Sequence, residues 1–161
     1  RTMNVLNCCD YKKYHQNIMN IFLADDDKDD RIFFSEALDE IPMKMETTEF
    51  PDGVGLMANL HSDKALPDVI FLDLNMPLMN GFECLSDIRQ DEKFLDIPVI
   101  IYSTSFHPME VERLEEMGAT GYLKKPTSYN QLKTLVYKCV NYIKDLSSPE
   151  VNKEQKFIIF E

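Results

Sequence analysis

Apolar runs and amphipathic stretches alternate along most of the chain. The runs predict strands at 19–25, 44–50, 68–73, 98–103 and 121–124. Apolar residues at three- and four-residue spacing predict helices at 28–41, 53–62, 82–92, 108–117 and 128–146. This alternation predicts an α/β domain, a doubly wound parallel sheet of five strands with five helices.

Individual segments support this pattern. The last predicted helix has the strongest amphipathic face, made of Leu132, Leu135, Val136, Cys139, Val140 and Ile143. Asp27 precedes the first predicted helix and is a candidate N-cap. The strands at 68–73 and 98–103 are continuously apolar, which is typical of central strands covered on both faces.

Size and charge narrow the classes of protein to consider. With 161 residues, 44% of them hydrophobic, the chain suits one compact domain without disulfides. We expect that domain at 18–146, between a leader at 1–17 and a tail at 147–161. A formal net charge of −11 argues against nucleic acid or an anionic membrane as partner. No apolar stretch approaches the ~20 residues that cross a bilayer, so we expect a soluble, cytoplasmic protein.

The four cysteines form no metal-binding or disulfide pattern. Cys8 and Cys9 are adjacent in the polar leader, whereas Cys84 and Cys139 stand among apolar residues of predicted helices. We interpret all four as reduced thiols, with redox sensing by Cys8 and Cys9 as the alternative.

Polar residues stand at the ends of four predicted strands. Asp25 and Asp26 end the first strand, Asp73 the third, Ser103 the fourth, and Lys125 follows the fifth. Carboxyl ends of parallel strands meet at one edge of the sheet, where ligands of open α/β folds bind. Three carboxylates at that edge repel one another unless a hard cation joins them, and oxygen ligands favour Mg²⁺.

These strand ends, with the segments VIFLDLNMP and GYLKKP, resemble the receiver domain of bacterial two-component response regulators over roughly residues 18 to 146. The resemblance implies the flavodoxin-like strand order 2-1-3-4-5. It also implies that Asp73 accepts a phosphoryl group from a phosphohistidine, on a sensor histidine kinase or phosphotransfer protein, or from a small phosphodonor. Its implied Mg²⁺ ligands are Asp26, Asp73 and the main-chain carbonyl of Asn75, with Asp25 acting directly or through water.

The same resemblance implies roles for Lys125, Ser103 and Tyr122. Lys125 would pair with the phosphoryl oxygens, and the following proline distinguishes it from Lys124; this Lys–Pro bond is typically cis in the family. Ser103 would move to hydrogen-bond the phosphoryl group, and Tyr122 would follow it inward. A downstream protein would read the change on the surface of 108–117, 121–124 and 128–146.

Other polar residues receive no role in this interpretation. Asp27, Asp29 and Asp30 are expected to be the solvated start of a helix, where negative charge is favourable. The three histidines, which are His15, His61 and His107, are not expected among the strand-end acids.

Alternatives remain for the function and for the tail. A receiver is not an ordinary enzyme, because it catalyses only its own phosphorylation and dephosphorylation. A haloacid-dehalogenase-like Mg²⁺-dependent phosphatase would want a second Asp where Asn75 stands, and a pseudo-receiver scaffold would need none of the pocket residues. The apolar segment FIIF at 157–160 is either a frayed chain end or an added edge strand, docked on the domain or on a second subunit of a homodimer.

Overall fold

Six strands form one sheet in the part of the chain that the structure describes, residues 18–148 and 156–161 of a computed structural model. Their order is β2-β1-β3-β4-β5-β6, and every neighbouring pair is parallel. In chain order the strands are β1 (Met19–Ala24), β2 (Met45–Phe50), β3 (Val69–Leu72), β4 (Val99–Ser103), β5 (Gly121–Lys124) and β6 (Ile158–Phe160).

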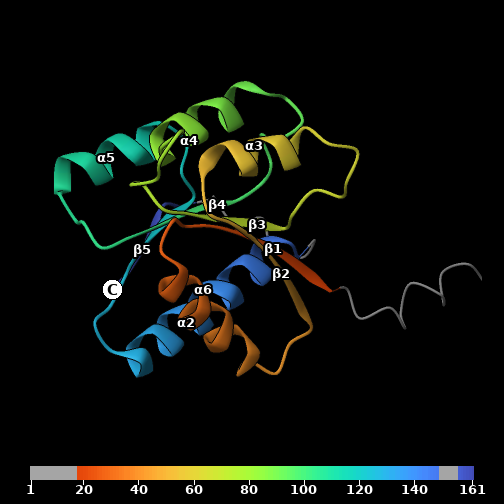
Figure 1. The fold of residues 1–161 in the computed structure, drawn as a ribbon. Helices are drawn as coiled ribbons and strands as arrows, with labels where there is room; N and C mark the ends of the chain where they lie inside the picture. The colour runs from red at the N-terminus through yellow and green to blue at the C-terminus, as the bar shows by residue number, and fades with distance from the viewer. Residues whose placement is uncertain (1–17, 149–155) are drawn as a thin grey trace, which may run out of the picture.

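Five helices cover the two faces of this sheet, as Figure 1 shows. One face carries α3 (Gly53–Leu60), α4 (Gly81–Gln90) and α5 (Pro108–Glu116), and the other carries α2 (Lys28–Asp39) and α6 (Tyr129–Leu146). The predicted doubly wound α/β architecture is therefore confirmed. The observed helix ends differ from the predicted ones by at most two residues, which is the usual uncertainty of helix boundaries.

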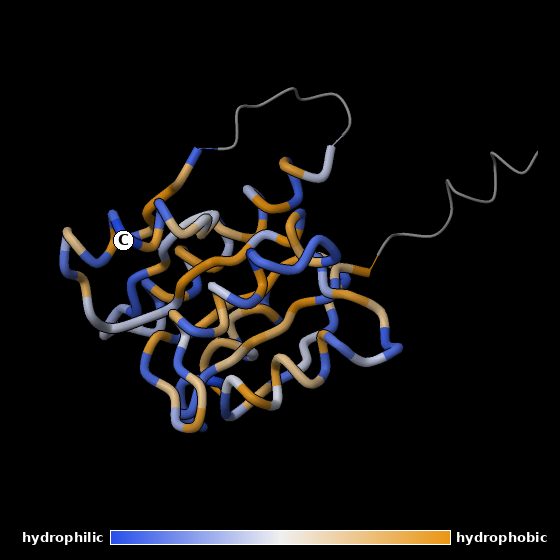
Figure 2. Tube along the Cα trace, turned by 90° about the horizontal axis from the view of Figure 1, so that it is seen from above, coloured by the Kyte–Doolittle hydropathy of each residue, from blue (hydrophilic) through white to orange (hydrophobic). Residues whose placement is uncertain are grey.

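Alternating side chains of the central strands supply two separate cores. Ile70 and Leu72 of β3 face the α3–α5 cluster, whereas Val69 and Phe71 face the α2/α6 cluster. We define the α3–α5 cluster by Leu56, Leu85, Ile88, Ile101, Leu114 and Tyr122, and the α2/α6 cluster by Phe34, Leu38, Phe71, Leu135, Cys139 and Val140. Apolar segments accordingly run through the interior of the domain, while polar segments gather at its outer turns (Figure 2).

Local sequence sets where the helices next to the acidic strand ends begin. The Asp27 side chain accepts hydrogen bonds from the backbone N–H groups of Asp29 and Asp30, which confirms it as the N-cap of α2. Asn80 and Glu83 form a reciprocal capping box at the start of α4. A Cβ atom at Gly81 would lie 2.3 Å from the carbonyl oxygen of Asp73, so this glycine lets α4 begin directly against the end of β3.

The sixth strand corrects the sequence-based count of five. FIIF forms an edge strand parallel to β5, so the frayed-end alternative is wrong for these residues. A short apolar segment at a chain end carries no periodicity that distinguishes a strand from a disordered end, and only pairing with β5 makes it a strand. Residues 1–17 and 149–155, including Cys8, Cys9 and His15, lie outside the described residues.

The two described cysteines are free and buried, one in each cluster. Burial raises the pKa of Cys84 to about 12 and raises the pKa of Cys139 as well, which makes both thiols poor nucleophiles. Across residues 18–148 and 156–161, no helix combines the length and the apolar character needed to cross a membrane.

Candidate functional site

Parallel pairing brings the strand-end carboxylates together. In the register of β1 and β3, Ala24 stands opposite Leu72, so Asp25 and Asp73 leave the sheet side by side. The N–H of Asp73 donates to the carbonyl oxygen of Ala24 at 2.9 Å, which extends that pairing into the site. The sequence alone placed these residues at one edge, and the structure confirms their proximity.

Asp25, Asp26 and Asp73 form a compact cluster of carboxylates. One oxygen from each lies within 4.8 Å of the other two. Asp25 is fully buried, Asp73 is 6% exposed, and Asp26 faces solvent. The cluster therefore has two buried members and one that opens the site to water.

Lys125 supplies the opposing charge from the end of β5. Its Nζ donates to Oδ2 of Asp25 at 2.6 Å and to Oδ2 of Asp30 at 2.8 Å, and lies 3.5 Å from Oδ2 of Asp73. The side chain is only 7% exposed. Lys124 is exposed and lies over the ring of Phe106, so the choice of Lys125 from its following proline agrees with the geometry.

Asp30 is the residue of this site that sequence reasoning missed. We expected it to be a solvated acid of the helix start, but it makes an ion pair with Lys125. Helical side chains point back toward the helix N-terminus, and α2 begins directly after the end of β1. This direction brings the side chain of Asp30, the third residue of α2, back to the strand edge. It is the signal in the sequence that could have identified Asp30 as part of the site.

Burial and mutual repulsion shift the protonation of the two buried acids. Burial, with repulsion from Asp25 and Asp26, raises the pKa of Asp73 to about 6 from its ordinary value of 3.8, although Lys125 opposes the shift. Burial likewise raises the pKa of Asp25, against the hydrogen bond from Lys125. Burial would lower the pKa of Lys125, but hydrogen bonds to Asp25 and Asp30 outweigh it and raise that pKa. The site thus has an excess of negative charge that one lysine does not neutralise.

Ser103 and Tyr122 lie on neighbouring strands beside the acids. Ser103 is fully buried at the end of β4, and its hydroxyl is 3.2 Å from that of Ser105. Tyr122 is buried on β5, donates its O–H to the carbonyl oxygen of Ser105, and meets the Phe106 ring edge-to-face at 5.5 Å. The loop after β4 therefore connects the Ser103 hydroxyl to the aromatic ring of Tyr122 on β5.

The remaining sequence expectations have mixed outcomes. The N–H of Asn75 lies 3.5 Å from Oδ1 of Asp73, so its backbone lies at the site. His61 pairs with Asp91, and His107 stands before α5 without making a side-chain cap, so neither joins the acids. The Lys125–Pro126 bond is trans, and the expectation of a cis bond is wrong. Trans is the lower-energy form of most X–Pro bonds.

The donor set suits a hard divalent cation. Three carboxylates supply oxygen ligands, and burial is the main cause that raises the pKa of Asp25 and Asp73, with repulsion from Asp25 and Asp26 adding to the shift at Asp73. No sulfur or imidazole ligand belongs to this cluster. The residues present therefore fit Mg²⁺ or Mn²⁺ better than a metal that prefers softer ligands.

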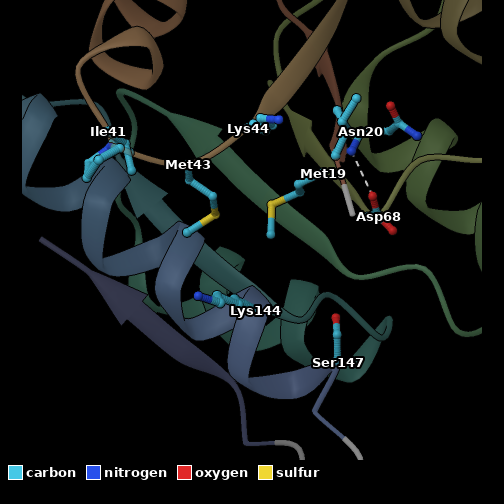
Figure 3. A pocket seen from close by; sticks show the side chains of 10 residues that line it. Met19, Asn20, Ile41, Met43, Lys44, Asp68, Lys144 and Ser147 are labelled. Atoms are coloured by element: carbon cyan, nitrogen blue, oxygen red, sulfur yellow. Dashed lines mark hydrogen bonds between the residues drawn. The ribbon is translucent and has the colours of Figure 1, made fainter. Parts of the chain in front are cut away.

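A cavity lies at the other end of the strands. It measures about 980 Å³ and is lined by residues that include Met19, Met43, Lys44 and Lys144 (Figure 3). Beside it, the N–H of Asn20 donates to Asp68 at 2.7 Å. Ligands of open parallel sheets bind at the carboxyl ends of strands, so the acidic cluster is the better candidate site.

Comparisons with known proteins give relatives over most of the described domain. A family model described as the response regulator receiver domain matches residues 21–137. The response regulator Rcp1 of Synechocystis is 31% identical over 121 residues, which cover 72% of this chain and 82% of Rcp1. The chain also spans 16% of the sensor histidine kinase CheAY of Helicobacter pylori and 51% of the probable methanogenesis regulatory protein FilR2 of Methanothrix harundinacea.

Solved structures give the same fold. The phosphorylated cyanobacterial phytochrome response regulator RcpA superimposes with a TM-score of 0.76 at 28% identity, covering 82% of this chain and 98% of RcpA. The Mn²⁺-bound form of Rcp1 superimposes with a TM-score of 0.70 at 28% identity, covering 84% of this chain and 99% of Rcp1.

Proposed function

Since the chain belongs to the response regulator receiver domain family, we propose that it is a phosphoacceptor switch, phosphorylated on Asp73. The observation that carries this proposal is the juxtaposition of Asp73 with two further carboxylates and with Lys125 at the carboxyl edge of the sheet. Asp73 is buried enough to be held in place, and exposed Asp26 opens the site to solvent.

The reaction is a phosphoryl transfer to a carboxylate oxygen. An oxygen of Asp73 attacks phosphorus, and a P–O bond forms as the bond from phosphorus to the donor breaks. The leaving group takes the bonding electron pair. It is the imidazole of a phosphohistidine on a histidine kinase or phosphotransfer protein, or the acetate of acetyl phosphate. The product is an acyl phosphate. Lys125 can form an ion pair with the added phosphoryl oxygens once the hydrogen bonds from Lys125 to Asp25 and Asp30 rearrange.

Asp25, Asp26, Asp73 and the main-chain carbonyl of Asn75 would hold the divalent cation, for which we propose Mg²⁺. When bound, the cation neutralises charge that develops on the transferring phosphoryl group. Asp25 is fixed for this role, because its Oδ1 accepts from the N–H of Asp27 at 2.9 Å. The same fixation orients Oδ2 toward Lys125.

Ser103, Ser105 and Tyr122 are proposed to convert phosphorylation into a change at the surface. The Ser103 hydroxyl would give up its contact with the Ser105 hydroxyl and hydrogen-bond the phosphoryl group instead. Because Tyr122 donates to the carbonyl oxygen of Ser105, the resulting movement of Ser105 would reach β5. A downstream protein would then read the altered surface around α5, β5 and α6. Such coupling is typically worth about 1–3 kcal/mol.

Intact-mass measurement tests the chemistry. The full chain incubated with acetyl phosphate and Mg²⁺ should gain the mass of one phosphoryl group, and EDTA should prevent the gain. Asp73→Asn should gain none, whereas Asp29→Asn, which changes an exposed acid near the site, should behave as wild type. A wild-type chain that stays unmodified would favour the pseudo-receiver alternative, and an Asp73→Asn chain that is still modified would exclude Asp73.

A further inference from the structure

The C-terminal strand β6 occupies an edge of the sheet that β5 would otherwise expose. Its three residues pair in parallel with β5, with Gly121 opposite Ile158, Tyr122 opposite Ile159 and Leu123 opposite Phe160. Strand pairing of this kind uses main-chain hydrogen bonds for affinity and alternate side chains for specificity. The tail therefore binds β5 as an added peptide strand would.

Side chains of the tail, residues 156–161, pack against both faces of the sheet. Phe157 packs against the α3–α5 cluster, while Phe160 is buried in the α2/α6 cluster, 6.1 Å from the ring of Tyr142. The O–H of Tyr142 also donates to the carbonyl oxygen of Lys156 at 2.9 Å. Ile159 remains 43% exposed. Two aromatic residues three positions apart are thus the main anchors.

The receiving strand is shaped for a close backbone. A Cβ atom at Gly121 would lie 2.7 Å from the carbonyl oxygen of Ile158, which is closer than real contacts allow. Any side chain at position 121 would therefore push the added strand away from β5. Beside Phe157 a cavity of about 270 Å³ also remains, bounded by Arg89, Glu115 and Gly118.

The attachment is short enough to exchange. A strand of three residues at a sheet edge makes few main-chain bonds, and segments of this kind open at a lower free energy than the core. The tail remains covalently joined to α6 through residues 149–155, so it rebinds as a tethered ligand with an effective concentration on the order of mM. An incoming segment must compete with that local concentration.

We propose that the β5 edge is a strand-docking site, that residues 156–161 are its resident occupant, and that an extended segment of a partner protein binds there in place of the tail. The fitting segment has aromatic residues at its first and fourth positions, matching Phe157 and Phe160. The site depends on the geometry of β5 and α6 and not on any chemistry at Asp73. A non-phosphorylatable chain should keep it.

A peptide added in trans tests the site. The probe is the segment EQKFIIFE, residues 154–161, with a fluorophore at its N-terminus, and the receiver is the full chain carrying Phe157→Ala and Phe160→Ala to release its own tail. Fluorescence anisotropy should show saturable binding to this variant. Binding to the wild-type chain should be at least tenfold weaker, because the resident tail competes for the same edge.

Two matched controls test whether the peptide binds at the β5 edge. A peptide with alanine at both phenylalanine positions should lose binding to the tail-released variant. Adding Gly121→Val to that variant should abolish binding, with circular dichroism confirming that the fold persists, since the new side chain blocks the approach of Ile158. Absence of saturable binding, equal binding to wild type, or binding that survives Gly121→Val would each overturn the proposal.

Hydrogen exchange on the wild-type chain supplies a test that needs no variant. Excess unlabelled peptide should speed the exchange of the amides at 158–160 at least severalfold while the β4 amides stay protected, since displacement frees only the tail. Unchanged exchange at 158–160, at peptide concentrations well above the mM range, would show that the tail is a fixed strand and would refute exchange.

Discussion

Lys125 holds the acidic edge together in the absence of a cation. Among the described residues it is the only positive group that hydrogen-bonds the carboxylate of the buried Asp25, since Arg31 donates to the main-chain carbonyl oxygen of Asp25, and the Lys125 side chain is almost fully enclosed. A buried charge that loses its partner costs far more than an exposed one, because protein atoms replace water around it. The negative charge of the carboxylates at this edge is therefore balanced mainly by the ammonium group of Lys125.

Replacing Lys125 should expose that dependence. We expect Lys125→Met to lower the free energy of unfolding by about 3 kcal/mol in EDTA, as for other broken buried ion pairs. Lys124→Met is the matched control and should change it by less than about 0.5 kcal/mol, because Lys124 is exposed. Urea denaturation of both variants measures this. Equal losses would show that Lys125 is not the charge that balances the cluster.

The pKa of Asp73 predicts a pH-dependent stability. A raised native pKa means that the folded state binds the proton more tightly than the unfolded chain, so the favourable contribution is complete below about pH 4 and is lost as pH rises through about 6. In EDTA at pH 7 we expect Asp73→Asn to unfold with a free energy about 1–3 kcal/mol higher than wild type. Urea denaturation should show the difference shrinking toward pH 4. A difference independent of pH would contradict the raised pKa.

A substitution at Asp26 tests the role of this residue in metal binding separately from protein stability. Asp26 is exposed and makes no ion pair among the described residues, so its charge contributes repulsion within the cluster. Asp26→Ala should abolish Mg²⁺-dependent phosphorylation and leave the metal-free protein at least as stable as wild type in thermal denaturation. Asp29→Ala, an exposed acid of the same loop-helix junction, should keep phosphorylation. A clear loss of stability in Asp26→Ala would reveal a structural role.

Much of the site follows from the sequence because strand ends have simple geometry. Asp25, Asp26 and Asp73 directly follow apolar runs, and parallel pairing places such residues at one edge. The ion pair of Asp30 with Lys125 does not follow in full, because the backward direction of helical side chains indicates only where Asp30 points, and the packed structure is needed to place Lys125 within its reach. The raised pKa of Asp73 also depends on burial that only the packed structure specifies.

At the scale of elements, Arg89 ties the end of α4 to two loops. Its guanidinium donates to the carbonyl oxygens of Gly118 at 2.8 Å, Phe94 at 3.2 Å and Ile97 at 3.0 Å. Arg89→Met should lower the free energy of unfolding by about 2–4 kcal/mol, because three carbonyls lose a charged donor at once. Arg113→Met should cost about 0.5–1 kcal/mol, since Arg113 is exposed and makes a cation–π contact with Phe82. Chemical denaturation distinguishes the two, and similar losses would refute the role of Arg89 as a tie.

Periodicity predicted the five strand-helix units because each element has a face to bury. The five predicted strands and helices all occur, and the continuously apolar strands β3 and β4 are central. β6 could not be predicted with the same force, since its three residues have no repeat, and its pairing depends on a glycine far away in the sequence.

At the scale of the whole molecule, the sheet separates two cores and places distinct features at its margins. The acidic cluster lies at the carboxyl edge, a cavity of about 980 Å³ lies at the amino edge, and the tail strand covers the edge of β5. Ser105 and Tyr122 connect the first of these margins to β5, on which the tail strand pairs. In the function we propose, this layout would let a charge change at Asp73 be read elsewhere on the domain.

Locating the phosphoryl group on the chain tests the central claim most directly. After incubation with acetyl phosphate and Mg²⁺, borohydride reduction converts a phosphorylated aspartate to homoserine, which peptide mass spectrometry then assigns to a position. We expect homoserine at position 73 and unmodified aspartate at 25, 26 and 30. Homoserine at any of those three positions, or a phosphorylated chain with aspartate intact at 73, would contradict the assignment of Asp73 as the phosphoacceptor.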